Sequence, residues 1–388
     1  MKTKLKLGIE TLEKKTLMAV FLDKQINDYM NTAYADNNIS RTEIISTFRI
    51  AADYGAVDNN EMTDLNNILT NCKMDPFVKG SATNLLNSPA NKGKDLKANT
   101  TSTEVVRLID KWFYGKERPT IDWGTYQKVE GQIFVNGPSA ADVKQGGVGD
   151  CYFVAALASV ADKNPKVIQD MIVDNMDETW TVRFVNRFGT GDFDFTFSYV
   201  VVDKFLPVSG TNGSIYASFG TNYTSKNNEL WVSMLEKAYV QWNETGLTKQ
   251  GNTLNSYQAI SGGWSHTVYE QLYPMYVSNG FNFGNSENIL RNALRGGNPV
   301  VVYRYMNSQR TSAHAYFLRS YNETTGTYVL HNPWGFSHLT RTFEQMKTDC
   351  YGWAMAPNKW ATSYGMAISI PAKSSKTTIQ ARTWYVMG

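Results

Sequence analysis

A glutamine, a cysteine, a histidine and an asparagine follow one another in an order suited to thiol chemistry: Gln145, Cys151, His314 and Asn332. Cys151 ends the run Gln-Gly-Gly-Val-Gly-Asp-Cys and precedes alanines and a leucine that favour a helix. Asp150 is a predicted N-cap, so Cys151 would lie in the first helical turn, where the helix dipole favours a thiolate. Gln145 could fold back across the glycines, and its amide with the Cys151 backbone N–H would form an oxyanion hole.

Two predicted strands carry the histidine and the asparagine. Residues 314–321 and 327–332 have strand-like composition, and the segment between them has that of a turn. A hairpin centred on residue 323 would place His314 opposite Asn332, to within one residue. The amide oxygen of Asn332 would then orient the imidazole, whose other nitrogen would face the cysteine as a thiolate–imidazolium pair.

Each of these features also has a structural explanation. A lone cysteine on an alanine-rich helix is usually a buried core residue, and a histidine on a strand is usually structural. The segment that begins at Asn332 could be a simple turn, although Trp334 in it could also cover the His–Asn pair and exclude water. Three other histidines compete for the catalytic role: His266, His331 and His338. The combination, in this order, favours a catalytic cysteine.

The first part of the chain, 1–122, is predicted to be a helical region. Ser40–Glu43 and Thr101–Glu104 have the pattern of capping boxes in front of amphipathic runs. Residues 89–102 are polar and lysine-rich, and they are predicted to form a linker or an exposed loop. We expect the helical region to dock beside the active-site cleft and to modulate access to it.

Strand-like periodicity begins at about residue 124. Alternating apolar residues at 180–184 and 193–199 predict two half-buried antiparallel strands. Residues 230–242 place aromatic and aliphatic side chains on one face of a long helix, and 300–303 has the composition of a central strand. The fold class is therefore predicted to be α+β.

A glycine pair divides this second part of the chain. Gly262–Gly263 is interpreted as a hinge between two lobes. The predicted lobes are 123–262, which carries Cys151, and 263–388, which carries the histidine and the asparagine.

The composition indicates a globular protein of two or three domains. The chain has 388 residues, 42% hydrophobic and 13% aromatic, enough for a large core. A formal net charge of +3 gives no reason to expect nucleic-acid binding, and no apolar run reaches the roughly 18 residues of a membrane span. Three cysteines are too few for a disulfide scaffold. The apolar run at 17–22 follows a lysine-rich N-terminus, is a poor secretory signal and favours an amphipathic helix.

The segment 145–158 resembles the active-site segment of the calpain family of papain-like cysteine proteases. The likeness covers roughly residues 124–370, and it is closer to bacterial members with a helical N-terminal region than to animal members with C-terminal calcium modules. Further segments match in order and at compatible spacing: 200–207, 229–239, 261–263, 314–316 and 332–335.

The resemblance implies a two-lobed papain-like fold with the active site in the cleft. It implies four catalytic roles: nucleophile for Cys151, general base and then acid for His314, orienting residue for Asn332, and oxyanion-hole donor for Gln145. It also implies four substrate-binding residues: Gly149, Trp334, Gly262 and Gly263. Two positions beside the reactive residues depart from the family: Tyr152 in place of tryptophan, and Ala313 in place of glycine.

The resemblance also bears on calcium, which calpain cores bind in two acidic loops. Asp142 matches one ligand of the first loop, but its glutamate partner is replaced near Thr196. The acidic positions of the second loop fall at His338 and near Gln345. Calcium needs six to eight oxygen ligands, several of them charged. We therefore expect no required cofactor and no calcium switch through these sites.

The predicted function is hydrolysis of peptide bonds in peptide or protein substrates by a monomeric cysteine endopeptidase. One alternative is a thiol acyl transferase on the same fold, transglutaminase-like or ligase-like, which would incorporate amines faster than it hydrolyses. Another is a catalytically silent peptide-binding module, whose thiol would be unreactive. The sequence leaves open a bacterial cytoplasmic location or export.

Overall fold

The computed structural model describes residues 21–189 and 194–358. Most of the apolar run at 17–22, and Phe193 of the predicted strand, lie outside these residues. The described part is a mixed protein of helices and antiparallel sheets, which confirms the α+β prediction. In it no helix is both long and apolar enough to cross a bilayer.

The N-terminal helices pack around a core of their own, which includes Phe48, Leu65 and Leu108. The Ser40–Glu43 capping box is present, whereas at Thr101 only half of one forms, because Glu104 bonds Arg107 instead. The bounds are α2 (Lys24–Ala33), α3 (Arg41–Ile50), α4 (Asn59–Asn71), α5 (Pro76–Leu86), the 3₁₀ turn η1 (Pro89–Asn91) and α6 (Ser102–Trp112).

Residues 89–102, predicted to be a linker or an exposed loop, form a loop that is exposed only in part. Ala90, Asn91 and Leu96 are buried among the N-terminal helices, and the backbone N–H of Val57 donates to Thr100 O at 2.9 Å. Asn91 Nδ2 donates to Asn84 O at 2.9 Å. The polar side chains of this segment form hydrogen bonds with the backbone of its own turns and of neighbouring turns. Its polar composition therefore indicates hydrogen-bonded turns rather than exposure to solvent.

The middle of the molecule is built around α9 (Trp231–Trp242), all of whose residues are buried, not one face as predicted. Phe184 stacks on Trp242, and Phe153 stacks on Tyr239, so the helix holds a sheet on one side and the cysteine helix on another. Around it lie β1 (Thr125–Lys128), η2 (Ala140–Asp142), α7 (Cys151–Lys163), α8 (Pro165–Met171), β2 (Ile172–Asp174), β3 (Thr179–Arg187), β4 (Phe195–Asp203), β5 (Phe205–Val208), η3 (Asn243–Thr245), η4 (Tyr257–Ile260) and α10 (Ser265–Leu272).

Strand β3 is buried on both faces over most of its length, which corrects the prediction of a half-buried strand. Arg183, paired with Tyr199 in β4, is only 3% exposed. Tyr199 makes an edge contact with Phe77 of α5, with ring centroids 5.2 Å apart. The second face is thus covered by the N-terminal helices, which the local alternation could not reveal.

The C-terminal part forms a six-stranded antiparallel sheet in the order β10-β9-β8-β7-β11-β6. Its bounds are β6 (Ser278–Gly280), η5 (Phe283–Asn285), α11 (Glu287–Arg295), β7 (Val300–Tyr305), β8 (Ala313–Asn322), β9 (Thr327–His331), β10 (Leu339–Thr342), α12 (Phe343–Asp349) and β11 (Cys350–Met355). Strand β7 lies inside the sheet, as predicted. The domain boundaries at 122 and 262 stay predictions.

The cysteine helix lies along this sheet. Ala315 and Phe317 of β8 share one buried core with Phe153 and Leu157 of α7. At the far end of the helix Lys163 Nζ donates to Arg319 O at 2.8 Å. The two halves of the catalytic region are therefore packed against each other.

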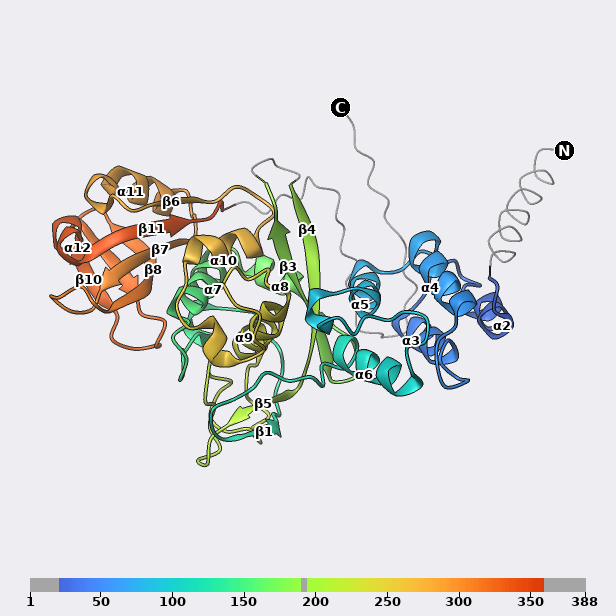
Figure 1. Ribbon diagram of the computed structural model, residues 1–388. Coiled ribbons are helices and arrows are strands. Elements are labelled where there is room, and N and C mark those ends of the chain that lie inside the picture. Colours follow the sequence, from blue (N-terminus) through green and yellow to red (C-terminus); the bar gives the residue numbers. More distant parts are fainter. Residues whose placement is uncertain (1–20, 190–193, 359–388) are drawn as a thin grey trace.

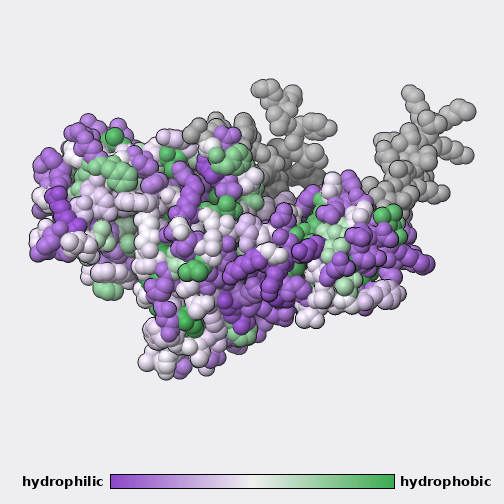
Figure 2. Space-filling view, viewed as in Figure 1, coloured by the Kyte–Doolittle hydropathy of each residue, from purple (hydrophilic) through white to green (hydrophobic). Residues whose placement is uncertain are grey.

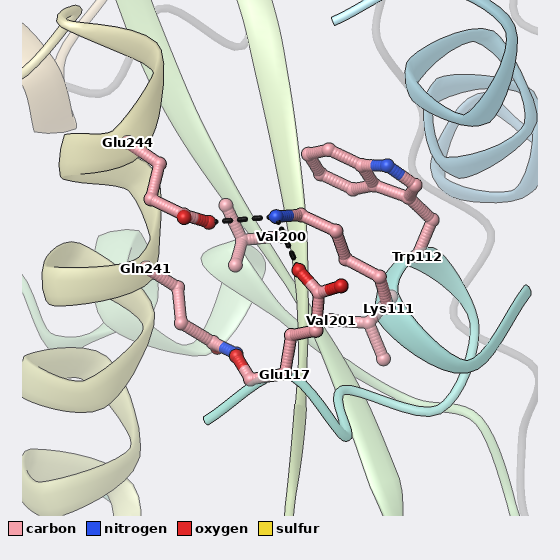
Figure 3. A pocket seen from close by; sticks show the side chains of 7 residues that line it. All are labelled: Lys111, Trp112, Glu117, Val200, Val201, Gln241 and Glu244. Carbon is pink, nitrogen blue, oxygen red and sulfur yellow. Dashed lines mark hydrogen bonds and ion pairs between the residues drawn. The ribbon is translucent and has the colours of Figure 1, made fainter. Parts of the chain in front are cut away.

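The N-terminal helices attach on the side away from that contact. Figure 1 shows them at one end of the molecule, the β6–β11 sheet at the other, and α7, α9, β3 and β4 between. Lys111 of α6 is 7% exposed, and its Nζ bonds Glu117 at 2.7 Å, Glu244 of η3 at 2.8 Å and Ala90 O at 2.9 Å (Figure 3).

This junction contradicts the expected docking beside the cleft. The N-terminal region contacts β4, the end of α9 and, through Arg41, the turn before β3 at Asp177. Figure 2 shows hydrophilic side chains gathered over the junction on the face that it draws.

Candidate active site

Cys151 is the first residue of α7, and the second half of the molecule reaches its sulfur. The backbone N–H of Ala315, the residue after His314, donates a hydrogen bond to that sulfur. Asp150 is at the N-cap position, but its side chain makes no capping hydrogen bond and is fully buried. The helix starts without a side-chain cap, because the Asp150 carboxyl is engaged elsewhere.

His314 and Asn332 form the predicted side-chain pair. His314 Nε2 lies 2.9 Å from Asn332 Oδ1, and both residues are buried. An amide oxygen can only accept, so Nε2 carries the proton and Nδ1 is the ring atom that can take one. The Trp334 ring lies over the imidazole, with centroids 4.6 Å apart, and it is 37% exposed.

The backbone register of the hairpin differs from the prediction. The ladder pairs Phe317 with His331, and a bulge between Leu318 and Ser320 shifts the register. His314 pairs with Arg304 of β7 but lies beyond the part of β8 that pairs with β9, so it is not opposite Asn332 in the ladder. The two side chains still meet, because Asn332 follows the end of β9 and turns back toward β8.

Asn332 is held by more groups than the sequence predicted. Its Oδ1 also accepts the Trp334 backbone N–H at 3.1 Å, and its own backbone N–H donates to His338 Nδ1 at 3.0 Å. His338 was interpreted only as a competing histidine and as a replaced acidic position. Its place just after the turn that begins at Asn332 is the signal that could have assigned it to the site.

Burial dominates the electrostatics of the reactive pair. It raises the pKa of the Cys151 thiol to about 11, although the Ala315 N–H opposes the shift. Burial also lowers the pKa of His314, against the hydrogen bond to Asn332. The expectation that the helix dipole would favour a thiolate is therefore wrong for this resting structure, in which both shifts favour neutral thiol and imidazole. Within the described residues no hydrogen bond joins the Cys151 sulfur to the His314 ring.

Gln145 lies beside the cysteine helix but is occupied with its own loop. Its Nε2 donates to Val148 O at 2.8 Å and to Asp150 Oδ1 at 3.3 Å. Its backbone N–H donates to Pro333 O at 2.8 Å, which ties the loop to the segment after Asn332. No contact places the amide on Cys151, so the oxyanion role stays a prediction.

Three of the four predicted substrate-binding residues form one wall beside the cysteine. The Gly262 N–H donates to Gly149 O at 2.9 Å, and a Cβ on Gly149 would lie 2.6 Å from Ser261 Oγ. A Cβ on Gly263 would lie 2.6 Å from the Tyr152 ring. The chain is therefore tightly packed at these glycines, against a backbone oxygen at Gly262 and against side chains at Gly149 and Gly263. Substrate binding at these positions and at Trp334 stays a prediction.

The positions compared with calcium ligands have other partners. Asp142 Oδ2 accepts the indole N–H of Trp231 at 3.0 Å and the Ser139 N–H at 2.7 Å. Gln345 closes the capping box of α12. Among the residues that the structure describes, no three His, Cys, Asp or Glu side chains are grouped to hold a metal ion.

Comparisons with known proteins agree with this arrangement. Residues 108–362, more than half of the chain, match the family described as calpain family cysteine protease. Calpain-5 of Mus musculus is 30% identical over 160 residues, which are 39% of this chain and 22% of the relative. Calpain clp-1 of Caenorhabditis elegans is 27% identical over 243 residues, 58% of this chain and 29% of the relative.

A plant relative extends the comparison. The calpain-type cysteine protease DEK1 of Zea mays is 31% identical over 134 residues, 34% of this chain and 5% of the relative. The chain thus spans less than a third of the length of each of these relatives. The family match includes the cysteine helix, the histidine strand and the asparagine turn. With these three elements placed together, and with the match over most of the catalytic region, the chain belongs to the calpain family of cysteine proteases.

Proposed function

We propose that this protein is a cysteine endopeptidase that hydrolyses peptide bonds in peptide or protein substrates. One observation carries the proposal: His314 is oriented by Asn332 at 2.9 Å, while the N–H of the next residue, Ala315, bonds the Cys151 sulfur. Nucleophile, base and orienting residue are therefore within one constellation, as thiol proteases require.

In the proposed reaction the Cys151 sulfur attacks the carbonyl carbon of the scissile bond while its proton passes to His314 Nδ1. The resulting oxyanion is stabilised by the Cys151 backbone N–H and, after rotation of its side chain, by Gln145. The C–N bond then breaks, and the imidazolium gives its proton to the leaving amine. Water next adds to the thioester while His314 takes its proton, and the carboxylic acid leaves with the thiol restored.

Neutral resting groups fit this sequence of steps. The lowered pKa of His314 keeps Nδ1 unprotonated at neutral pH, so the imidazole can act as a base. The raised pKa of Cys151 in this structure fits a transfer of its proton to His314 that accompanies attack. Substrate binding that excludes water from the charged pair is expected to favour this transfer.

The test compares the wild type with Cys151→Ala and His314→Ala. We expect both variants to lose peptide hydrolysis by at least about a thousandfold, because each removes a member of a unit that acts together. Iodoacetamide labelling should modify Cys151 and leave Cys72 unreacted, since Cys72 is 4% exposed in the N-terminal core. Undiminished hydrolysis by Cys151→Ala would exclude the proposal, and amine incorporation faster than hydrolysis would favour an acyl transferase.

We further propose that the enzyme works as a monomer, without nucleic acid and without calcium activation. The calcium part rests on the hydrogen bonds of Asp142 to Trp231 and Ser139, and on His338 and Gln345, which bind protein groups. The nucleic-acid part rests on the nearly balanced formal net charge of +3. The same assays with added calcium and with EDTA should give equal rates, and light scattering should give the mass of one chain. A saturable rise in rate with calcium that Asp142→Ala abolishes would contradict the calcium part.

A further inference from the structure

Two buried carboxyl groups meet at the end of the 144–150 loop, which leads to the nucleophile: one is in the loop and the other is on α9. Asp150 is 0% exposed and Glu236, on α9, is 1% exposed. The two side chains are hydrogen-bonded to each other. Within the described residues neither carboxyl forms an ion pair with a cation. Burying two acidic groups without a cation is costly unless they share a proton.

Glu236 anchors one side of the 144–150 loop through a neighbouring segment. Both of its carboxyl oxygens accept the backbone N–H of Ala217, at 3.0 and 3.2 Å, while Ser233 Oγ donates to Ala217 O at 2.7 Å. This segment pairs with the loop in turn: the Gly147 N–H donates to Ile215 O at 2.8 Å. Glu236 and Ser233, one turn apart on α9, thus hold the 215–217 segment to which the loop is hydrogen-bonded.

Asp150 anchors the other side of the same loop. Its Oδ1 accepts the amide of Gln145, and its backbone oxygen accepts the N–H groups of Phe153 and Val154 at 2.7 and 3.1 Å. Through Asp150, Glu236 therefore acts on both groups proposed to meet the oxyanion, the Gln145 amide and the N–H of Cys151.

The groups around the pair supply no positive charge. Asp150 faces Cys151, Tyr152 and Tyr239, while Glu236 faces Tyr216 and Tyr257. Burial raises the pKa of both carboxyls, most strongly that of Glu236. Both shifts favour one shared proton, with the acid form of Glu236 facing Asp150, over two buried negative charges.

We propose that Glu236 is a positioning residue of this active site: as a carboxylic acid it donates a hydrogen bond to Asp150 and fixes the 144–150 loop from both sides. The inference rests on the proposed peptidase function. The shared proton keeps a second negative charge away from the place where the oxyanion develops, and the two anchors hold the backbone of the loop that carries Gln145 and leads to the Cys151 N–H.

The main test compares Glu236→Gln with Glu236→Ala. The glutamine can donate to Asp150 and accept from Ala217, so we expect kcat within about threefold of wild type. The alanine removes both bonds, and we expect kcat to fall by at least about tenfold with little change in KM, since oxyanion stabilisation acts on the transition state. Ser233→Ala removes only the second anchor of Ala217 and should have a smaller effect on kcat. Glu270→Gln, a surface change, should have none.

The proton itself has a separate readout in thermal unfolding. A carboxyl whose pKa is raised on folding stabilises the native state below its unfolded pKa and loses that contribution as pH rises through the folded pKa. The Tm of the wild type should therefore fall from pH 5 to pH 8 by a few degrees more than that of Glu236→Gln. Ser233→Ala and Glu270→Gln should keep the wild-type slope.

The two readouts separate the possible failures. A wild type without peptidase activity defeats the proposed function, while the Tm slope still decides whether the carboxyls share a proton. Wild-type kcat in Glu236→Ala, or a Tm slope unchanged in Glu236→Gln, overturns the positioning role. Loss of kcat in Glu236→Gln equal to that in Glu236→Ala also overturns it, because the conservative variant then fails to rescue.

Discussion

His338 is the residue whose role in the site rests most directly on one hydrogen bond. Its Nδ1 accepts the backbone N–H of Asn332, and its ring stacks on His331 at 3.9 Å between centroids. Burial, with smaller electrostatic effects of the neighbouring His338 and Arg319, lowers the pKa of His331 to about 4, so the His331 ring is neutral at neutral pH. The stack and the bond together fix the start of the turn that presents Asn332 to His314.

Replacing His338 should therefore weaken catalysis without touching the reacting atoms. His338→Leu leaves the buried Asn332 N–H without an acceptor, which costs about 1–3 kcal/mol and lets the amide turn from the imidazole. We expect kcat to fall by about tenfold or more. His338→Asn, which places an oxygen near the position of Nδ1, should restore most of it. His331→Phe keeps the ring stacking and serves as the control. A wild-type kcat for His338→Leu in steady-state kinetics would contradict the positioning role of His338.

At this scale the sequence predicted contacts better than it predicted charge states. The predicted contact between His314 and Asn332 is present, while the catalytic roles of Cys151, His314 and Asn332 stay predictions. The thiol pKa was predicted in the wrong direction, because the helix dipole is a local property, whereas burial of the sulfur comes from a strand far along the chain. The partner of Asp150 was missed for the same reason, since Glu236 looks like one position of an amphipathic helix.

Among the elements, the 144–150 loop is the one whose backbone path is most constrained. A Cβ on Gly146 would lie 2.1 Å from Tyr216 O and 2.6 Å from Ile215 O. Both are backbone atoms held by α9, so neither can move aside cheaply. The loop therefore depends on glycine at this position for close approach, not for an unusual φ.

Gly146→Ala should displace the loop and the groups that it carries. We expect a loss of stability of about 1–3 kcal/mol from overpacking and a fall in kcat of at least about tenfold. Gly210→Ala is the matched control, since a Cβ there meets nothing within 4 Å. Urea unfolding and peptide hydrolysis measure the two effects. Equal behaviour of the two variants would show that the loop can shift without consequence.

The elements were predicted where periodicity and capping are local. The strand pair at β8 and β9 and the central position of β7 were confirmed. The hairpin register was not, because Asn322 pairs with Thr327, so the turn is centred further along the chain than residue 323. The two-sided burial of β3 was missed, because the covering helix α5 is contributed by a different region of the chain.

At the scale of the whole molecule, the N-terminal helices are joined to the catalytic region through a buried cation. Lys111 lies between Glu244 of η3 and Glu117 (Figure 3). Replacing this lysine by a neutral residue would leave both carboxylates in place without its positive charge. Lys92 bonds the same Glu244 at 3.0 Å, but its side chain is 67% exposed. The chain thus offers two lysines that share one partner and differ in burial.

Lys111→Met should destabilise the protein far more than Lys92→Met. Removing one partner of a buried ion pair costs about 3–5 kcal/mol, toward the lower end here because Glu117 is 34% exposed, while an exposed pair contributes about 1 kcal/mol or less. Lys111→Met combined with Glu244→Gln should recover part of the loss, since the second change removes a buried charge whose remaining partner, Lys92, is exposed. Urea unfolding measures all three. The contact of Lys111 with Glu244 lies away from Cys151. We therefore expect kcat to be unchanged at temperatures where each variant is folded. A fall in kcat without a loss of stability would instead mean that the N-terminal helices act on the active site through this contact.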